Sequence, residues 1–449
     1  MILARLTVLL ALGLIGCGND GGATQLLEIS VAGEGIVTAT AQGIACAEES
    51  CRYRLPGGEK VTLVATASPG HRFEAWGGAC SKKNACELTM SGDRAVEATF
   101  DALDAVDRVQ KLIPSGAKTG DKIYAVDIEG DLAIAGMRNV PSSSSPAVEA
   151  AYVFERSAGR WVQLERIDAP NGCRGFGHTV AIDGGWALVG AHYTDTGAGT
   201  VYFFKREGTK WSQLRIDAPQ RAAYDYFGIS VALEGTTALV GAPGPGSDPD
   251  DGRVHVLELQ GQTWKVTGGL AGPAGLFGYS VALDGGTVLV GAPEEGSGAA
   301  YTFEETSGGW KQTARLVTSV GSNFGRGVGL DAGVAFVASY GKSFVFERTG
   351  SGWTEKYSLP LDATATDVAG NTLVTANTAA GGGSGAVRIA RRLGGKWVEG
   401  KALAAPDGKA GDKLGAPVAI SVTTVITAAP GRDDAASNAG AVYFFELTP

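Results

Sequence analysis

The stretch Phe227-Gly228-Ile229-Ser230-Val231-Ala232-Leu233, followed by Leu239-Val240-Gly241-Ala242-Pro243, decides the fold of most of this chain. Nearly the same two phrases return at Phe277-Gly278-Tyr279-Ser280-Val281-Ala282-Leu283 and Leu289-Val290-Gly291-Ala292-Pro293. Each phrase is a short apolar run bounded by glycine, which predicts a β-strand. A period of roughly 40–50 residues built from short strands predicts a propeller or an array.

Related phrases occur seven times in residues 102–449, which predicts seven blades. The blades begin at Gly120-Asp121, Phe176-Gly177, Phe227-Gly228, Phe277-Gly278, Phe324-Gly325, Thr366-Asp367 and Lys413-Leu414. Each blade shows a third strand, such as Val201-Tyr202-Phe203-Phe204, and six continue into a fourth that opens with Trp161, Trp211, Trp264, Trp310, Trp353 or Trp397. The composition agrees, because 68 glycines spread through a chain with 44% hydrophobic residues fit many tight turns.

The seventh blade lacks a fourth strand of its own, since its third strand, Val442-Tyr443-Phe444-Phe445, is followed only by Glu446 to Pro449. The run from Asp107 to Ile113 precedes the first blade and has no blade of its own. We expect this run to complete the seventh blade, because pairing the two ends of the repeat array closes the ring and removes open sheet edges.

The pattern F-G-x-S-V-A-L…L-V-G-A-P resembles the FG-GAP repeat, the unit of the integrin α-chain propeller. The resemblance is strongest in the second, third and fourth blades, and it implies a seven-bladed propeller within an all-β protein. Phe and Gly are expected to pack where blades meet, and Gly-Ala to let the inner strands crowd around the axis.

In that family, some blades carry a calcium loop of the form D-x-D-x-D-G after the second strand. This chain has fragments at that place, in Asp248-Pro249-Asp250-Asp251-Gly252 and Asp433-Asp434. Calcium takes roughly six to eight oxygen ligands, which carboxylates at alternate positions can supply. Neither fragment has the full spacing, so a solvated acidic loop is the alternative. The candidate metal ligands are Asp248, Asp250, Asp251, Asp433 and Asp434, and no other cofactor is expected.

Residues 1–16 have the pattern of an export signal. Arg5 precedes an apolar run, Leu6 to Ile15, that is too short to span a bilayer but fits the core of a signal peptide. The sequence Leu14-Ile15-Gly16-Cys17 resembles the bacterial lipobox, in which the cysteine is lipidated and becomes the first mature residue. Residues 17–25 are then the lipidated Cys17 and a tether. The alternative is an ordinary signal peptide with a chance cysteine.

Four of the six cysteines, Cys46, Cys51, Cys80 and Cys86, lie within residues 26–101. An exported chain meets an oxidising compartment, so disulfides are expected. The pairs Cys46–Cys51 and Cys80–Cys86 are favoured among three pairings, because each brackets a short polar loop. Structural zinc is the alternative, although the spacing is looser than zinc sites use. Cys173 remains as a free thiol.

Residues 26–101 also contain Val61-Thr62-Leu63, Phe73 and Trp76, and end in Val96-Glu97-Ala98-Thr99-Phe100. This pattern resembles the bacterial extracellular repeat domain related to the internalin B-repeat. The resemblance implies a small β-rich module stapled by disulfides, which serves as a stalk or spacer. Trp76 is interpreted as a core residue.

The net charge of −9 argues against a nucleic-acid partner. We find no nucleophile elbow, zinc-protease motif or P-loop, and His178 and His255 are interpreted as structural. The sequence therefore predicts a monomeric, non-catalytic protein of the cell envelope, lipid-anchored at the outer membrane or cell surface. Its propeller would bind a protein or glycan, or act as a structural element.

Two alternatives stay open: a secreted hydrolase or lyase that uses the axial face, and a periplasm-facing assembly scaffold. Carboxylates clustered at one end of the axis would favour the enzyme, whereas an exposed aromatic patch would favour binding.

Overall fold

The computed structural model describes residues 24–33, 35–67, 71–80, 85–102, 106–139, 148–208, 210–244, 252–273, 275–319, 321–350, 352–359, 365–432 and 440–447. The chain divides into two compact units, Met1–Ala102 and Leu103–Pro449. Strands dominate both, which confirms the predicted all-β class. In the described ranges, no helix is long and apolar enough to cross a membrane.

The first unit consists of two four-stranded sheets. One has the order β4 (Ser50–Pro56), β1 (Thr24–Ala32), β8 (Arg94–Ala102), β6 (His71–Gly78); the other has the order β3 (Ile44–Cys46), β2 (Gly35–Ala39), β5 (Lys60–Ala67), β7 (Cys86–Thr89), and a 3-10 turn spans Thr40–Gln42. Alternate residues of β5 are buried, as its period of two requires. Trp76 packs in the core with Leu27, Ile29 and Phe100, as the sequence predicted.

Three strands of this unit, β3, β4 and β6, were not expected from the sequence. Strand β6 contains a bulge between Phe73 and Ala75, which breaks the alternation of apolar residues. Strand β4 alternates arginine with tyrosine and leucine, and it pairs with a neighbour, β1, on one side only.

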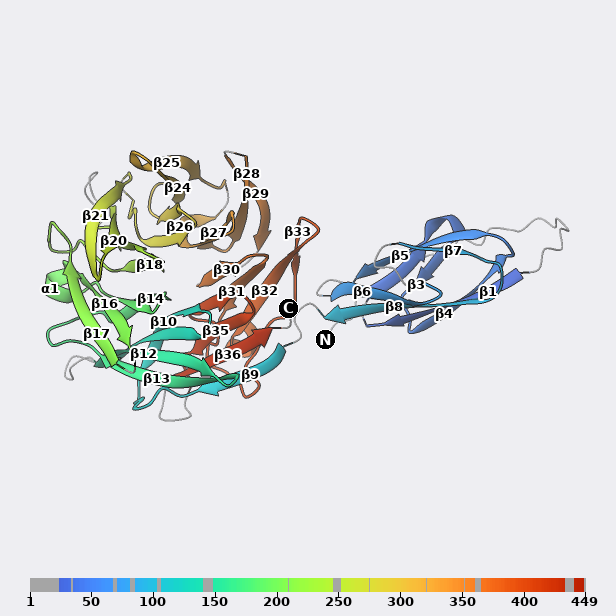
Figure 1. Ribbon diagram of the computed structural model, residues 1–449, viewed down its shortest axis with the longest axis horizontal. Helices are drawn as coiled ribbons and strands as arrows, with labels where there is room; N and C mark the ends of the chain where they lie inside the picture. Colours follow the sequence, from blue (N-terminus) through green and yellow to red (C-terminus); the bar gives the residue numbers. More distant parts are fainter. Residues whose placement is uncertain are drawn as a thin grey trace. The chain divides into compact units, whose positions relative to one another are not determined.

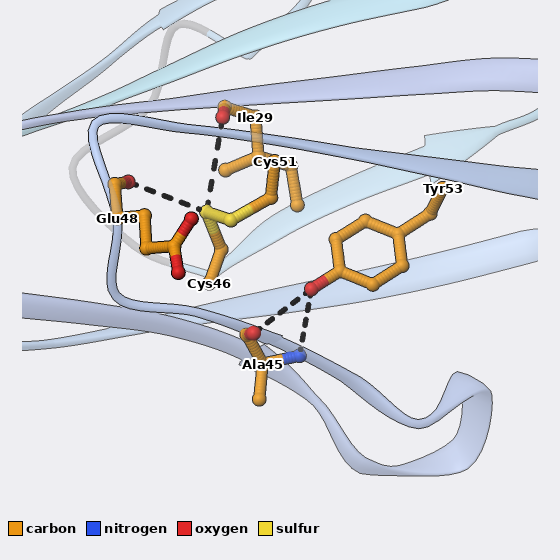
Figure 2. The surroundings of a disulfide bond; sticks show 6 residues. All are labelled: Ile29, Ala45, Cys46, Glu48, Cys51 and Tyr53. Carbon is orange, nitrogen blue, oxygen red and sulfur yellow. Dashed lines mark hydrogen bonds between the residues drawn. A yellow bond between two sulfur atoms is a disulfide. The ribbon is translucent and has the colours of Figure 1, made fainter.

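Each disulfide joins an edge strand of one sheet to the nearest edge of the other. Cys46 at the end of β3 is bonded to Cys51 in β4 (Figure 2), and Cys80, just beyond β6, is bonded to Cys86 in β7. This is the pairing that the sequence favoured. Figure 2 also shows Tyr53 of β4, which donates its hydroxyl proton to the carbonyl of Ala45 at 2.8 Å. Both open sides of a small core are therefore stapled, which a unit of this size needs.

The second unit is a propeller. Within the described residues it has seven antiparallel four-stranded sheets that follow one another around a ring (Figure 1). Blade 1 consists of β10 (Lys122–Glu129), β11 (Leu132–Asn139), β12 (Val148–Ser157) and β13 (Arg160–Asp168). Blade 2 consists of β14 (Phe176–Asp183), β15 (Trp186–Ala191), β16 (Thr200–Glu207) and β17 (Lys210–Asp217). Blade 3 consists of β18 (Ser230–Glu234), β19 (Thr237–Ala242), β20 (Arg253–Gln260) and β21 (Thr263–Ala271).

Blade 4 consists of β22 (Ser280–Asp284), β23 (Thr287–Ala292), β24 (Ala299–Thr306) and β25 (Gly309–Leu316). Blade 5 consists of β26 (Ser322–Asp331), β27 (Val334–Tyr340), β28 (Ser343–Thr349) and β29 (Gly352–Leu359). Blade 6 consists of β30 (Thr366–Ala369), β31 (Thr372–Asn377), β32 (Ala386–Leu393) and β33 (Lys396–Glu399). Blade 7 consists of β34 (Val418–Ser421), β35 (Thr424–Ala429), β36 (Ala441–Leu447) and β9 (Val106–Leu112). Two short helical turns, α1 (Thr194–Gly197) and α2 (Ala380–Gly383), lie in connections.

The ring is closed by β9, which pairs antiparallel with β36 (Figure 1), so that Leu112 lies opposite Val442 and Val109 opposite Phe445. The predicted closure is confirmed. Trp161 of blade 1 stacks on Phe444 of blade 7, with 4.4 Å between ring centroids. Side-chain packing therefore also stabilises the junction between the first and last blades.

Neighbouring blades touch through paired glycines. The glycine of the Leu-Val-Gly-Ala phrase lies against the carbonyl oxygen of the Phe-Gly glycine in the next blade. A Cβ atom built on Gly190 would lie 2.1 Å from the oxygen of Gly228, and one on Gly241 would lie 2.0 Å from the oxygen of Gly278. The same contact joins Gly136 to Gly177 and Gly291 to Gly325. We call these four pairs the glycine belt.

The serine or threonine of the Phe-Gly phrases in blades 2, 3 and 4 strengthens the belt. Ser230 donates its hydroxyl proton to the Gly278 carbonyl at 2.7 Å, and Ser280 does the same to Gly325 at 2.8 Å. Thr179 makes the equivalent bond to Gly228 at 2.9 Å. The most regular part of the repeated phrase is thus explained by contact between blades.

A side chain at the glycine belt should destabilise the propeller. We expect Gly241→Ala to lower the free energy of unfolding by about 2 kcal/mol or more, because its methyl group would overlap backbone atoms that cannot move independently. Gly268→Ala in the same blade is the matched control, since no atom lies within 4 Å of its Cβ position. Chemical denaturation measures both; equal effects would contradict the role of the belt.

Candidate functional site

The inner strands surround an axial channel with two different ends. At the hairpin end, the first strand of each blade turns into the second. At the other end, which we call the FG end, the first strands begin and the second strands finish. The two ends carry different side chains.

Carboxylates crowd the hairpin end around a cavity of about 620 Å³, lined by Asp127, Glu129, Asp183, Glu234, Asp284, Asp331 and Asp367. Most are the last residue of a first strand. Asp127 and Asp367 lie two residues before the end of their strands, and in blade 6 the last position is Ala369.

These acidic side chains link each blade to the next. Asp127 accepts the backbone N–H of Ile182 at 2.8 Å, and Asp367 accepts that of Ile420 at 2.9 Å. Equivalent bonds join Asp183 to Gly235, Glu234 to Gly285, Asp284 to Ala332, and Asp331 to Gly370, while the Ser421 hydroxyl accepts from Gly130 and completes the circuit. We call these seven acceptors the carboxylate belt.

Most carboxylates of the acidic cluster belong to the carboxylate belt and therefore have a structural role. In the part of the chain that the structure describes, no three His, Cys, Asp or Glu side chains are placed to hold a metal ion. This belt was not predicted from the sequence. A signal for three of its members was present, because an acidic residue precedes glycine at Asp183-Gly184, Glu234-Gly235 and Asp284-Gly285.

Three belt carboxyls have raised pKa values. Burial, together with the charge of Asp331, raises the pKa of Asp284, and the larger shifts are at Asp127 and Asp367. Burial raises the pKa of Asp127 to about 6, against the lowering effect of its backbone hydrogen bonds. Burial also raises the pKa of Asp367 to about 7, and the charge of Asp127 adds to that shift. Both side chains touch the channel, but protein surrounds them, so water compensates their charge poorly.

Neutralising Asp367 should stabilise the protein more at high pH than at low pH. Its folded-state pKa lies above the unfolded value, so its contribution to stability falls as pH rises from about 4 to about 7. We expect Asp367→Asn, which keeps an acceptor for the Ile420 N–H and loses the one for the Val368 N–H, to gain on the order of 2–4 kcal/mol between pH 5 and pH 8 relative to wild type. Denaturation at both pH values measures this. Glu234→Gln, an exposed belt member, is the control; a gain independent of pH for Asp367→Asn would contradict the burial argument.

The FG end is aromatic. Among the described residues, the exposed aromatic side chains are all tyrosines, and all lie at this end of the propeller: Tyr124, Tyr193, Tyr224, Tyr279 and Tyr340. Tyr124 and Tyr279 stand at the variable position of the Phe-Gly phrase, and Tyr340 ends the second strand of blade 5. A single face therefore holds the exposed aromatic surface of the propeller.

Six rings form a continuous row across blades 1 to 3, which we call the aromatic row: Tyr124, His178, His192, Tyr193, Tyr226 and Tyr224. Successive ring centroids are 5.9, 4.4, 4.0, 5.9 and 6.3 Å apart. The tyrosines at both ends and in the middle are exposed, whereas His192 is 1% exposed.

A buried ion pair lies beneath the row. Arg138 and Glu149, 3.1 Å apart, stand opposite each other on β11 and β12. At the corresponding places, blades 3, 4 and 7 have a proline just after the second strand and a glycine just before the third. Glu149 also accepts the backbone N–H groups of Gly175 and Phe176, both at 2.9 Å. The Arg138 guanidinium lies 5.5 Å from the Tyr124 ring centroid and 5.6 Å from that of Tyr193.

Both histidines of the row are neutral at physiological pH. Burial, with a smaller effect of the nearby Arg138 charge, lowers the pKa of His178 to about 4. Burial, His178 and Arg138 together lower the pKa of His192 to about 2. Nδ1 of His178 lies 3.3 Å from Arg138, so the imidazole accepts there and carries its proton on Nε2. Among the described residues, Nδ1 of His192 is buried and has no hydrogen-bond partner.

The remaining predicted residues have simpler positions. His255 lies on β20 and packs edge-on against Phe227, with 5.1 Å between ring centroids, a structural role like the one predicted. Cys173 is a partly buried free thiol. Cys17, Asp248, Asp250, Asp251, Asp433 and Asp434 lie outside the described residues, so the lipidation and calcium predictions stay predictions.

Comparisons with known proteins support the architecture. FG-GAP repeats are found at residues 161–204, 211–257, 271–303 and 397–445, and a divergent InlB B-repeat domain at residues 35–104. Both resemblances predicted from the sequence are confirmed. The FG-GAP match and the propeller fold favour a non-catalytic role in protein interaction or structure.

A sequence comparison with curated proteins finds no match. Among solved structures, the chain is similar to Chaetomium thermophilum Sqt1 bound to the N-terminus of ribosomal protein L10, with 11% identity, a TM-score of 0.46, and coverage of 73% of this chain and 86% of that one. Saccharomyces cerevisiae Sqt1 is also similar, with 11% identity, a TM-score of 0.41, and coverage of 74% and 97%.

Proposed function

We propose that this chain is a non-catalytic binding protein of the cell envelope, and that its propeller engages a protein or glycan partner through the FG end. One observation carries this proposal: every exposed aromatic side chain in the described part of the chain lies on that face. Tyrosine gives a large contact area at a low cost in conformational entropy, and its hydroxyl adds a hydrogen bond. Tyrosine and arginine also dominate the energetics of protein interfaces.

The hairpin end supports a second candidate, a hydrolase or lyase. Its specific observation is the pair Asp127 and Asp367, which face the cavity with raised pKa values, as a general acid would require. Both carboxyls already accept an N–H bond from the next blade, which makes the binding function the better supported. If the protein turned over a polysaccharide or peptide and the double variant Asp127→Asn/Asp367→Asn did not, the enzymatic function would become the better supported one.

Truncating the tyrosines should abolish binding without unfolding the propeller. We expect Tyr193→Ala/Tyr279→Ala/Tyr340→Ala to reduce capture of ligands from envelope extracts and glycan arrays at least about tenfold, because truncation removes exposed contact area. Val422→Ala at the hairpin end is the control, since Val422 is 78% exposed there. Equal capture by both variants would refute a binding role for the FG end.

We also propose that Cys17 carries the lipid that anchors the protein. Acyl chains contribute about 0.8 kcal/mol per buried CH₂, and two or more chains give stable anchoring. Cys17→Ser should therefore move the protein from the membrane to the soluble fraction, and mass spectrometry should find no acyl chains on it. A variant that stays in the membrane would exclude this anchor. Proteolysis of intact cells then distinguishes a surface protein, which is cleaved, from a periplasm-facing scaffold.

A further inference from the structure

We propose that the aromatic row is the binding subsite for an uncharged oligosaccharide chain. This inference rests on the proposed binding function and names its ligand class. It concerns blades 1 to 3.

The shape of the row matches an extended ligand. Its rings follow one another at 4.0 to 6.3 Å from Tyr124 to Tyr224, which is close to the length of one sugar ring. The faces of aromatic rings carry partial negative charge, and the axial C–H groups of a pyranose carry partial positive charge. Tyr124, Tyr193 and Tyr224, which are 40%, 46% and 52% exposed, can therefore stack on different sugars of one chain. His178 and His192 lie between Tyr124 and Tyr193, and Tyr226 lies between Tyr193 and Tyr224.

The hydrogen-bonding groups of the row also suit sugars. A sugar hydroxyl both donates and accepts, and so do a phenol and a neutral imidazole. His178 is half-buried between Tyr124 and His192, and it uses Nδ1 toward Arg138, so its Nε2–H remains as a donor. The row thus combines stacking faces with short polar groups, the usual composition of a small-molecule site.

The charges at the row favour an uncharged sugar. Arg138 is neutralised by Glu149, and both are buried. The neighbouring carboxylates are also engaged: Asp195 pairs with Arg215 and Arg221, and Asp225 accepts the backbone N–H of Ala222 at 3.0 Å. The six side chains of the row itself are uncharged at neutral pH, so a uronic acid or phosphorylated sugar would have to use the exposed Arg174 or Lys122, which flank the row.

The energetics of the row indicate a role beyond packing. Where blades 3, 4 and 7 have a proline and a glycine, blade 1 buries an ion pair, which hydrophobic or neutral residues could replace at little cost. His192 adds a buried Nδ1 with no partner, a cost that folded proteins ordinarily avoid. Residues that depart from the pattern of the other blades without improving stability are characteristic of functional sites.

The test is calorimetric titration of the full mature chain with cello-, malto-, manno- and chitohexaose as neutral probes, and hexagalacturonate as the acidic probe. We expect at least one neutral hexaose to bind at millimolar concentration or below. Tyr193→Ala and Tyr124→Ala should each weaken that binding about tenfold or more, and Tyr193→Phe less than about threefold. Val422→Ala at the hairpin end is the control, and melting temperatures verify that each variant is folded.

Three results would overturn the inference: no neutral hexaose binds, only hexagalacturonate binds, or Tyr340→Ala, outside the row, weakens binding as much as Tyr193→Ala. The proposed function is judged separately. If tyrosine truncation abolishes capture of a protein from envelope extracts while no sugar binds, the FG end is a protein-binding face and the glycan subsite is wrong. If truncation changes no capture at all, both are wrong.

Discussion

Close approach of two backbones is the interaction on which the propeller depends. A glycine on the second strand of one blade touches the carbonyl of a glycine at the start of the next, and a hydroxyl bonds to the same carbonyl. Because no side chain separates the strands there, the inner strands converge tightly at the FG end. At the hairpin end, the side chains of the carboxylate belt hold neighbouring blades together. The blades are thus held at two levels, and the channel between them has a fixed width.

These two levels leave different freedom for function. At the hairpin end, most acidic side chains accept a bond from the next blade, so replacing one disturbs a junction. At the FG end, the junction is made by backbone and by small residues. The side chains at the variable position of the Phe-Gly phrase and at the residue after Gly-Ala are therefore not needed for the junction between blades. Tyr124, His178, Tyr279 and His192 occupy those positions, which explains why the unusual side chains gather on this face.

Periodicity was sufficient to predict the blades, their number and the closing strand, because each depends on residues that recur. The small unit was predicted less completely. The bulge at Phe73 in β6 and the arginines of β4 interrupt the apolar alternation by which these two strands would have been recognised. The aromatic row could not be predicted, because its members come from three blades and are not alike. One signal was present, since Arg138 and His192 replace the proline of Gly-Ala-Pro in successive blades. Recognising them required aligning the blades by strand register rather than by sequence.

Ring closure by β9 and β36 has a consequence for how the protein folds. The closing pair joins residues 106–112 to residues 441–447, the longest sequence separation in the propeller. Blades 1 to 6 can form from local hairpins as the chain emerges, but the junction between the first and last blades waits for nearly the whole polypeptide. Until then, two sheet edges remain exposed to neighbouring chains. In a chain that crosses a membrane before folding, this intermediate with its exposed sheet edges would exist on the far side. It would stay able to associate with other chains until the last strand pairs, whichever blades had already formed.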